Sequence, residues 1–109
     1  MLLRRSKSLT ASQAAEALTR GELQLVDVRE ARELAEARVN GATHIPLGHL
    51  VERITELDRQ RPVAFLCRSG SRSAAATRMA TRAGLDASNV RGGVVAWRRA
   101  GLPLASPRR

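Results

Sequence analysis

Short apolar runs alternate along this chain with longer segments of helical periodicity, and this alternation favours an α/β fold. Residues 23–28 and 63–66 are predicted as mostly buried strands, because they are apolar and too short for helices. Brief extended pieces are expected at 42–45 and 89–90. The order of strands and helices predicts a mainly parallel sheet, whose ligands bind beyond the carboxyl ends of the strands.

Five segments between these runs have helical spacing or composition. They are the stretch from Thr10 to Gly21, residues 30–37, residues 48–59, residues of about 72–83, and the segment that follows Gly92-Gly93. Thr10 and Gln13 fit a capping box, and Gly21 is placed to end the first helix. Four strands and five helices fit within one compact domain.

The length of 109 residues allows a single domain, predicted at 9–104 between basic tails at 1–8 and 105–109. The net charge is +9, and nearly all the basic residues are arginine. This charge is either a compositional bias or a field that attracts anions. A nucleic-acid role is disfavoured because the arginines are spread along the chain and only 2% of the residues are aromatic.

The cysteine count and the search for targeting segments predict the compartment and the partners of the chain. It has one cysteine, so neither an internal disulfide nor a metal-ligand cluster around that residue is expected. No secretory signal and no stretch long enough to span a bilayer is found. We therefore expect a cytoplasmic monomer with no membrane partner, no metal and no cofactor.

The only cysteine stands where a predicted strand passes into a helix. Residues 67–73 read Cys-Arg-Ser-Gly-Ser-Arg-Ser. Such a turn is expected to expose the sulfur at the sheet edge and to direct backbone N–H groups and a helix N-terminus toward it. Gly70 supplies the backbone freedom, the serines supply hydroxyl donors, and Arg68 and Arg72 supply positive charge. These neighbours favour thiolate over thiol, and they would hold an anion against the sulfur.

A lone cysteine in an apolar stretch is more often an inert core residue. A buried inert cysteine does not need a polar, glycine-containing, doubly basic sequel. The predicted site residues are Cys67 as the catalytic nucleophile and Arg68, Ser69, Gly70, Ser71 and Arg72 as substrate ligands.

Four motifs give the chain a resemblance to rhodanese domains, from about residue 9 to 104. They are Asp27-Val28-Arg29, the segment Gly41 to Pro46, the loop Cys67 to Ser73, and Gly92-Gly93 to Trp97 with Gly101-Leu102-Pro103. The resemblance implies a central parallel five-stranded sheet with helices on both faces. It also implies that the cysteine loop is the active site of a sulfurtransferase.

In that family the thiolate attacks the outer sulfur of a donor such as thiosulfate and keeps it as a persulfide. A thiol or cyanide acceptor then collects the sulfur. By this resemblance Cys67 would carry the sulfur, the backbone amides of residues 68–72 would cradle it, and the side chains of Arg68 and Arg72 would attract the donor. The expected partners are a small anionic donor, thiosulfate or a persulfide, and a thiol acceptor.

Loop length separates this reaction from its relatives. Related phosphatases and arsenate reductases use Cys-x5-Arg, whereas here Arg72 gives Cys-x4-Arg and Ser73 holds the seventh position. The six-residue loop resembles the sulfur-transferring branch. A Cys-based phosphatase or arsenate reductase stays open as an alternative, as does a non-enzymatic interaction or regulatory module. Against the module, inactive rhodanese-like domains commonly lack the cysteine.

Other polar residues are interpreted structurally. Asp27 and Arg29 are expected to bond neighbouring loops and to pair with residues such as Glu33, rather than to act as acid or base. His44 and His49 occupy no motif position of a general base. Trp97 is expected to anchor the core, and the segment around the preceding Gly92-Gly93 turn borders the active-site mouth in rhodanese domains.

Overall fold

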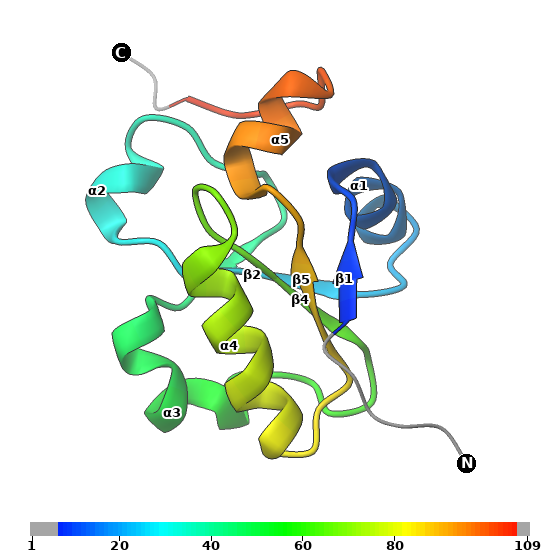
Figure 1. The fold of residues 1–109 in the computed structure, drawn as a ribbon, viewed down its shortest axis with the longest axis vertical. Helices are drawn as coiled ribbons and strands as arrows, with labels where there is room; N and C mark the ends of the chain where they lie inside the picture. Colours follow the sequence, from blue (N-terminus) through cyan, green and yellow to red (C-terminus); the bar gives the residue numbers. More distant parts are fainter. Residues whose placement is uncertain (1–6, 107–109) are drawn as a thin grey trace.

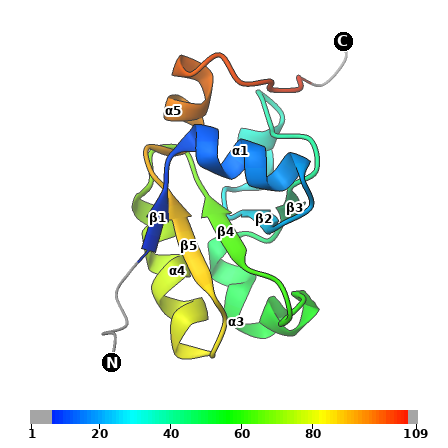
Figure 2. The same cartoon turned by 90° about the vertical axis from the view of Figure 1, so that its right-hand side faces the viewer.

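The computed structural model describes residues 7–106 and contains one five-stranded sheet. The strands are β1 (Lys7–Leu9), β2 (Gln24–Asp27), β3 (Thr43–His44), β4 (Val63–Leu66) and β5 (Ala87–Val90). Their order is β1-β5-β4-β2-β3, and every neighbouring pair is parallel. Figure 2 shows this order across the sheet. The predicted fold class, a parallel five-stranded sheet with helices, is confirmed.

The helices alternate with the strands along the chain, and all but the last connect two strands as crossovers. They are α1 (Ala11–Thr19), α2 (Ala31–Leu34), α3 (Leu50–Arg53), α4 (Ser71–Arg82) and α5 (Gly93–Arg99), with 3₁₀ turns at Leu47–His49 and Ile54–Glu56. The predicted capping box is present, because the Thr10 side chain accepts from the Gln13 N–H and Gln13 reaches back to Thr10. Gly21 follows α1 with φ of 71°, as expected for a helix stop.

The sheet is buried on both faces, which explains its apolar strands. Helices α3 and α4 cover one face over a core that contains Val26, Phe65 and Ala76. Helices α1 and α5 cover the other face over Leu25, Leu66 and Trp97. Because successive side chains of a strand point to opposite faces, Phe65 and Leu66 pack into different cores.

The N-terminal boundary of the domain lies earlier than the sequence indicates. Lys7 and Ser8, assigned above to the basic tail, belong to β1 and pair with Ser88 and Asn89 of β5. An edge strand of this kind is held by backbone hydrogen bonds, so it needs no apolar pattern and gives no sequence signal. The rest of that tail lies outside the described residues. At the other end, Ala105 bridges Arg38.

Two predicted helices are shorter than expected. The helix predicted at 30–37 is confined to Ala31–Leu34, because the Arg29 side chain takes the main-chain carbonyls of Glu33 and Ala37. The helix predicted at 48–59 is a 3₁₀ turn, one α-helical turn and a second 3₁₀ turn. Leu50, Ile54 and Leu57 still face the core, whereas Val51 is 74% exposed, so periodicity indicated most of the buried face and not the hydrogen-bond pattern.

None of the helices within residues 7–106 combines the length and the apolar character that crossing a membrane requires.

Candidate active site

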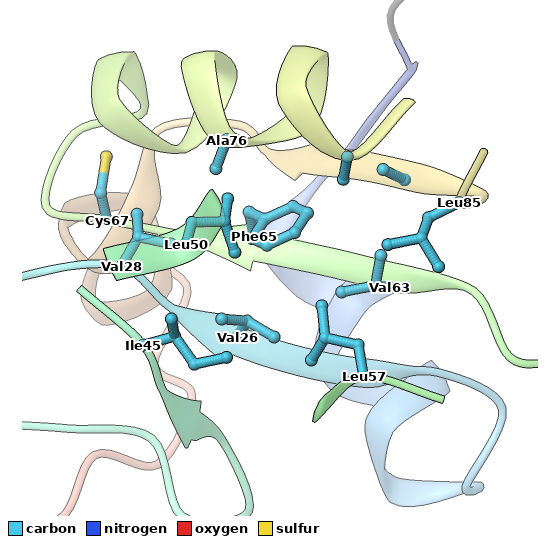
Figure 3. Close-up of a cluster of buried hydrophobic side chains, with 12 residues drawn as sticks. Val26, Val28, Ile45, Leu50, Leu57, Val63, Phe65, Cys67, Ala76 and Leu85 are labelled. Atoms are coloured by element: carbon cyan, nitrogen blue, oxygen red, sulfur yellow. The ribbon is translucent and has the colours of Figure 1, made fainter. Parts of the chain in front are cut away.

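Cys67 follows the last residue of β4 and lies at the end of the core that faces α4, as Figure 3 shows. Its exposed fraction is 1%, so the expectation of an exposed sulfur is wrong. The loop curls over the side chain, and the sulfur lies against the start of α4. The sulfur therefore lies among the hydrogen-bond donors of the loop and not at the open sheet edge.

Two polar groups contact the sulfur. The Gly70 N–H donates to Cys67 Sγ at 3.0 Å, and the Ser73 hydroxyl oxygen lies 3.3 Å from it. Burial raises the pKa of the Cys67 thiol, but hydrogen bonds from the Ser73 hydroxyl and from the backbone N–H groups of Ser73, Gly70 and Ser69 outweigh it, so the pKa is lowered. The site favours the nucleophilic thiolate.

Two glycines shape the loop. Gly70 has φ of 115°, a conformation that L side chains rarely adopt. A Cβ on Gly93 would lie 2.4 Å from the Cys67 carbonyl oxygen. This close approach lets the N–H groups of Val94 and Val95 donate to the carbonyls of Cys67 and Arg68 at 2.9 and 3.1 Å. The start of α5 thus holds the first half of the loop.

Arg72 holds the second half. Its guanidinium donates to both carboxylate oxygens of Glu33 in α2, at 2.8 and 2.9 Å. The side-chain hydrogen bond from Arg72 lowers the pKa of Glu33 to about 2. The arrangement differs from the expected one, in which Arg72 attracts a donor, because its charge is already paired with a carboxylate. No sequence pattern predicts this pair, because its two residues are 39 positions apart.

The turn after β2 is closed. Arg29 donates to both oxygens of Asp27, from Nε at 3.0 Å and from Nη2 at 2.9 Å, and both side chains are buried. His44 bonds the Arg29 carbonyl through Nε2. The structural interpretation of Asp27, Arg29 and His44 agrees with this geometry. Trp97 is also a core residue as expected, with Nε1 donating to the Pro103 carbonyl.

Beside the loop lies a cleft of about 430 Å³ between α2 and α5, the two helices that flank the loop in Figure 1. Arg68 from the loop lines it together with Val95, Arg98 and Arg99 from α5. Within residues 7–106 the guanidinium groups of Arg68, Arg98 and Arg99 form no hydrogen bond or ion pair. In the same lining Arg29 is paired with Asp27 and Glu33 with Arg72, and Glu36 adds one carboxylate. The cleft therefore offers unpaired positive charge next to the loop.

One polar residue of the site was missed from the sequence. Asn89 in β5 lies 2.5 Å from the Ser73 hydroxyl through Oδ1 and donates to the Gly70 carbonyl from Nδ2 at 3.3 Å. The available signal was its place near the carboxyl end of a parallel strand that neighbours β4. Across residues 7–106 no group of three or more His, Cys, Asp or Glu side chains comes together as a metal site.

Comparison with known proteins gives a consistent result. Residues 10–100 match the family model described as a rhodanese-like domain. The chain is 41% identical over 76 residues to the Bacillus subtilis protein YtwF, covering 70% of this chain and 74% of that protein. It is 37% identical over 84 residues to a protein of Allochromatium vinosum named as a sulfurtransferase, covering 76% and 78%.

A solved structure has the same fold. The rhodanese-related protein of Thermoplasma volcanium superposes with a TM-score of 0.85 at 31% sequence identity, covering 91% of this chain and 97% of that one.

Proposed function

Because this chain belongs to the rhodanese-like domain family, we propose that it is a sulfurtransferase that carries sulfane sulfur as a persulfide on Cys67. The observation that carries the proposal is the environment of the Cys67 sulfur. Cys67 lies at the carboxyl end of β4, receives the Gly70 N–H at 3.0 Å, and has a lowered pKa. Similarity to a protein named as a sulfurtransferase supports the reaction class.

In the first step the Cys67 thiolate attacks the outer sulfur of a donor such as thiosulfate. A new S–S bond forms at Cys67, and the S–S bond of the donor breaks with its electron pair on the departing sulfite. The negative charge of the persulfide is on its outer sulfur. Backbone N–H groups of residues 68–72 are proposed to stabilise that charge, as oriented amides stabilise other anions.

In the second step an acceptor thiolate or cyanide attacks the outer sulfur. The S–S bond of the persulfide breaks, its electron pair returns to Cys67, and the acceptor leaves as a persulfide or as thiocyanate. Neither step transfers a proton once both nucleophiles are ionised, so no general base is required. This agrees with the closed hydrogen bonding of Asp27, Arg29 and His44.

Arg68 is proposed to be the cation that attracts the donor. It lies next to Cys67 and lines the cleft with Arg98 and Arg99, whereas Arg72 is paired with Glu33. Arg72, with Ser69, Gly70 and Ser71, is proposed to shape the loop that receives the donor. A volume of about 430 Å³ exceeds what a small oxyanion fills and is in the range of organic ligand pockets. The cleft suits the remainder of an anionic organic donor or acceptor.

A donor panel tests the proposal. Purified protein is given thiosulfate or an organic persulfide with cyanide as acceptor, and thiocyanate formation is followed over time. We expect turnover with at least one donor, parallel lines in the double-reciprocal plots of a two-step mechanism, and no turnover of an aryl phosphate or arsenate. No sulfur transfer from any donor, by protein whose Cys67 still reacts with iodoacetamide, would falsify the proposal.

A further inference from the structure

Two acceptors compete for one proton beside the catalytic sulfur. The Ser73 hydroxyl oxygen lies 3.3 Å from Cys67 Sγ and 2.5 Å from Asn89 Oδ1. A serine hydroxyl has a single hydrogen to donate. Ser73 can therefore serve the sulfur or the amide, and not both at once.

The Gly70 carbonyl fixes the orientation of the Asn89 amide. A carbonyl oxygen can only accept, so the group that faces it at 3.3 Å must be the Nδ2 amino group. The opposite end of the amide, Oδ1, then faces Ser73 and requires a donor. Within residues 7–106 the Ser73 hydroxyl is the group that bonds it. When the sulfur carries no charge, the Ser73 hydroxyl therefore donates its proton to Asn89 Oδ1.

The charge on the sulfur decides where this proton lies. When Sγ is a thiolate, the hydroxyl turns toward it and joins the Gly70 N–H, and Asn89 Oδ1 loses its donor in a partly buried position. When Sγ is neutral, the hydroxyl returns to Asn89. Sγ is neutral in the thiol and also in the persulfide, whose charge lies on the outer sulfur.

We propose that Asn89 is a positioning residue that competes with Cys67 for the Ser73 proton and thereby favours the neutral forms of Sγ, the thiol and the persulfide, over the free thiolate. For the thiol this holds whatever Cys67 does, and for the persulfide it rests on the proposed function. Where the free form of Cys67 is the thiolate, the equilibrium between free and sulfur-loaded protein therefore shifts toward the persulfide. Ser73 donates the proton, and Asn89 is the acceptor that competes with the sulfur for it.

Other charges around the sulfur stay constant when Asn89 is exchanged. The nearest elements carry Arg29 after β2, Glu30 and Glu33 beside or in α2, Arg68 in the loop, Arg72 in α4, Arg91 after β5, and Arg98 and Arg99 in α5. Within the described part of the chain, none of these side chains forms a hydrogen bond or an ion pair with Asn89. A change of pH profile on replacing Asn89 therefore reports the hydroxyl proton and the loop carbonyl that Asn89 binds.

The test is the pH dependence of Cys67 alkylation by iodoacetamide, which requires no sulfur donor. Four proteins are compared: the unmodified chain, Asn89→Leu, Ser73→Ala and the double variant. We expect Asn89→Leu to lower the pKa of Cys67, so that alkylation well below that pKa is roughly threefold to tenfold faster. In the Ser73→Ala background, Asn89→Leu should leave the profile unchanged.

The double variant distinguishes an effect of Asn89 through the Ser73 proton from an effect through the Gly70 carbonyl of the loop. An unchanged or raised pKa in Asn89→Leu overturns the proposal. An equal shift with and without Ser73 also overturns it, because Asn89 would then act only through the Gly70 carbonyl. Asn89→Ala keeps the comparison decisive if Asn89→Leu does not fold. It also removes the competing acceptor without adding a charge, so it should lower the pKa of Cys67 only where the Ser73 hydroxyl is present.

Loading with sulfur tests the second half of the proposal. At a pH above the pKa of Cys67, where the free form is the thiolate, and at a fixed ratio of thiosulfate to sulfite, the ratio of persulfide to free Cys67 should fall severalfold in Asn89→Leu. An unchanged ratio at that pH contradicts this half. If the unmodified chain forms no persulfide at all, the proposed function fails, while the alkylation profiles still decide the role of Asn89.

Discussion

The turns that follow β2 and β4 lie side by side at one edge of the sheet, and each contains an arginine. Arg29 lies two residues after Asp27 in the first turn, and Arg68 directly follows Cys67 in the second. After β2, Arg29 closes on Asp27 with three side-chain hydrogen bonds. After β4, the sulfur of Cys67 accepts neutral donors, and the neighbouring Arg68 is exposed and lines a cleft. Similar composition thus gives a closed turn and an open one.

The difference lies in where the charge is used. In the β2 turn a buried cation and anion neutralise each other, which fixes the path of the chain toward α2. In the β4 loop, oriented N–H groups and the Ser73 hydroxyl stabilise the Cys67 thiolate, and the unpaired Arg68 remains available for a ligand. Substitution of Asp27 in the β2 turn should therefore lower mainly stability, whereas substitution of Cys67 in the β4 loop should lower mainly activity.

The largest effect on activity is expected from Cys67→Ala. This change removes the proposed nucleophile and should reduce sulfur transfer to the level of buffer, while the fold is retained because alanine fits the same apolar site. Thiocyanate formation measures the activity, and circular dichroism checks the fold. Residual transfer above one part in a hundred of the original rate would place the chemistry elsewhere than in the β4 loop.

The largest effect on stability is expected from Asp27→Asn in the other turn. It leaves the buried Arg29 without its carboxylate, a loss that typically costs about 3–5 kcal/mol of unfolding free energy. Urea denaturation measures this cost. Iodoacetamide should alkylate Cys67 in the folded fraction at the original rate. A stability change below about 1 kcal/mol would mean that the pair does not hold the turn.

A smaller loss of stability is expected from Glu33→Gln, which breaks the bidentate pair with Arg72. Both side chains are partly exposed, so we expect a cost of about 1–2 kcal/mol at pH 7. The pKa of Glu33 is depressed from 4.5 to about 2, so its contribution is complete above pH 4.5 and disappears as the pH falls toward 2. The two proteins should therefore converge in stability over that window, and a constant difference would exclude the ion pair as the cause.

The smallest effect is expected from Arg68→Gln. An exposed charge contributes little, so KM for thiosulfate should rise about twofold to fivefold while kcat stays nearly constant. Arg78→Gln on the exposed surface of α4 is the matched control, since it removes the same net charge away from the cleft. Equal effects of the two substitutions would assign the attraction to the overall charge of the chain and not to the β4 loop.

The sequence predicts most of the framework because its signals are local. The apolar run 63–66, the capping box at Thr10 and the Gly92-Gly93 turn are each specified by neighbouring residues, and each is found in the structure. Strand β1 was missed because backbone pairing at a sheet edge leaves no apolar pattern. The expected monomer in a cytoplasmic setting stays a prediction.

The site was predicted in its components and not in its contacts. Cys67, Gly70 and the lowered pKa follow from a loop that joins a strand to a helix. The pairing of Arg72 with Glu33 and the bond between Ser73 and Asn89 join residues far apart in the chain. Spacing cannot reveal such pairs, because only the folded sheet brings the ends of β2, β4 and β5 together.

The most direct test of the account is the intact mass of the protein after exposure to thiosulfate. We expect an added mass of about 32 Da, one sulfur atom, on the peptide that contains Cys67. This adduct should be absent from Cys67→Ala and should be removed by cyanide. An unchanged mass with every sulfane donor, or an adduct that persists in Cys67→Ala, would contradict it.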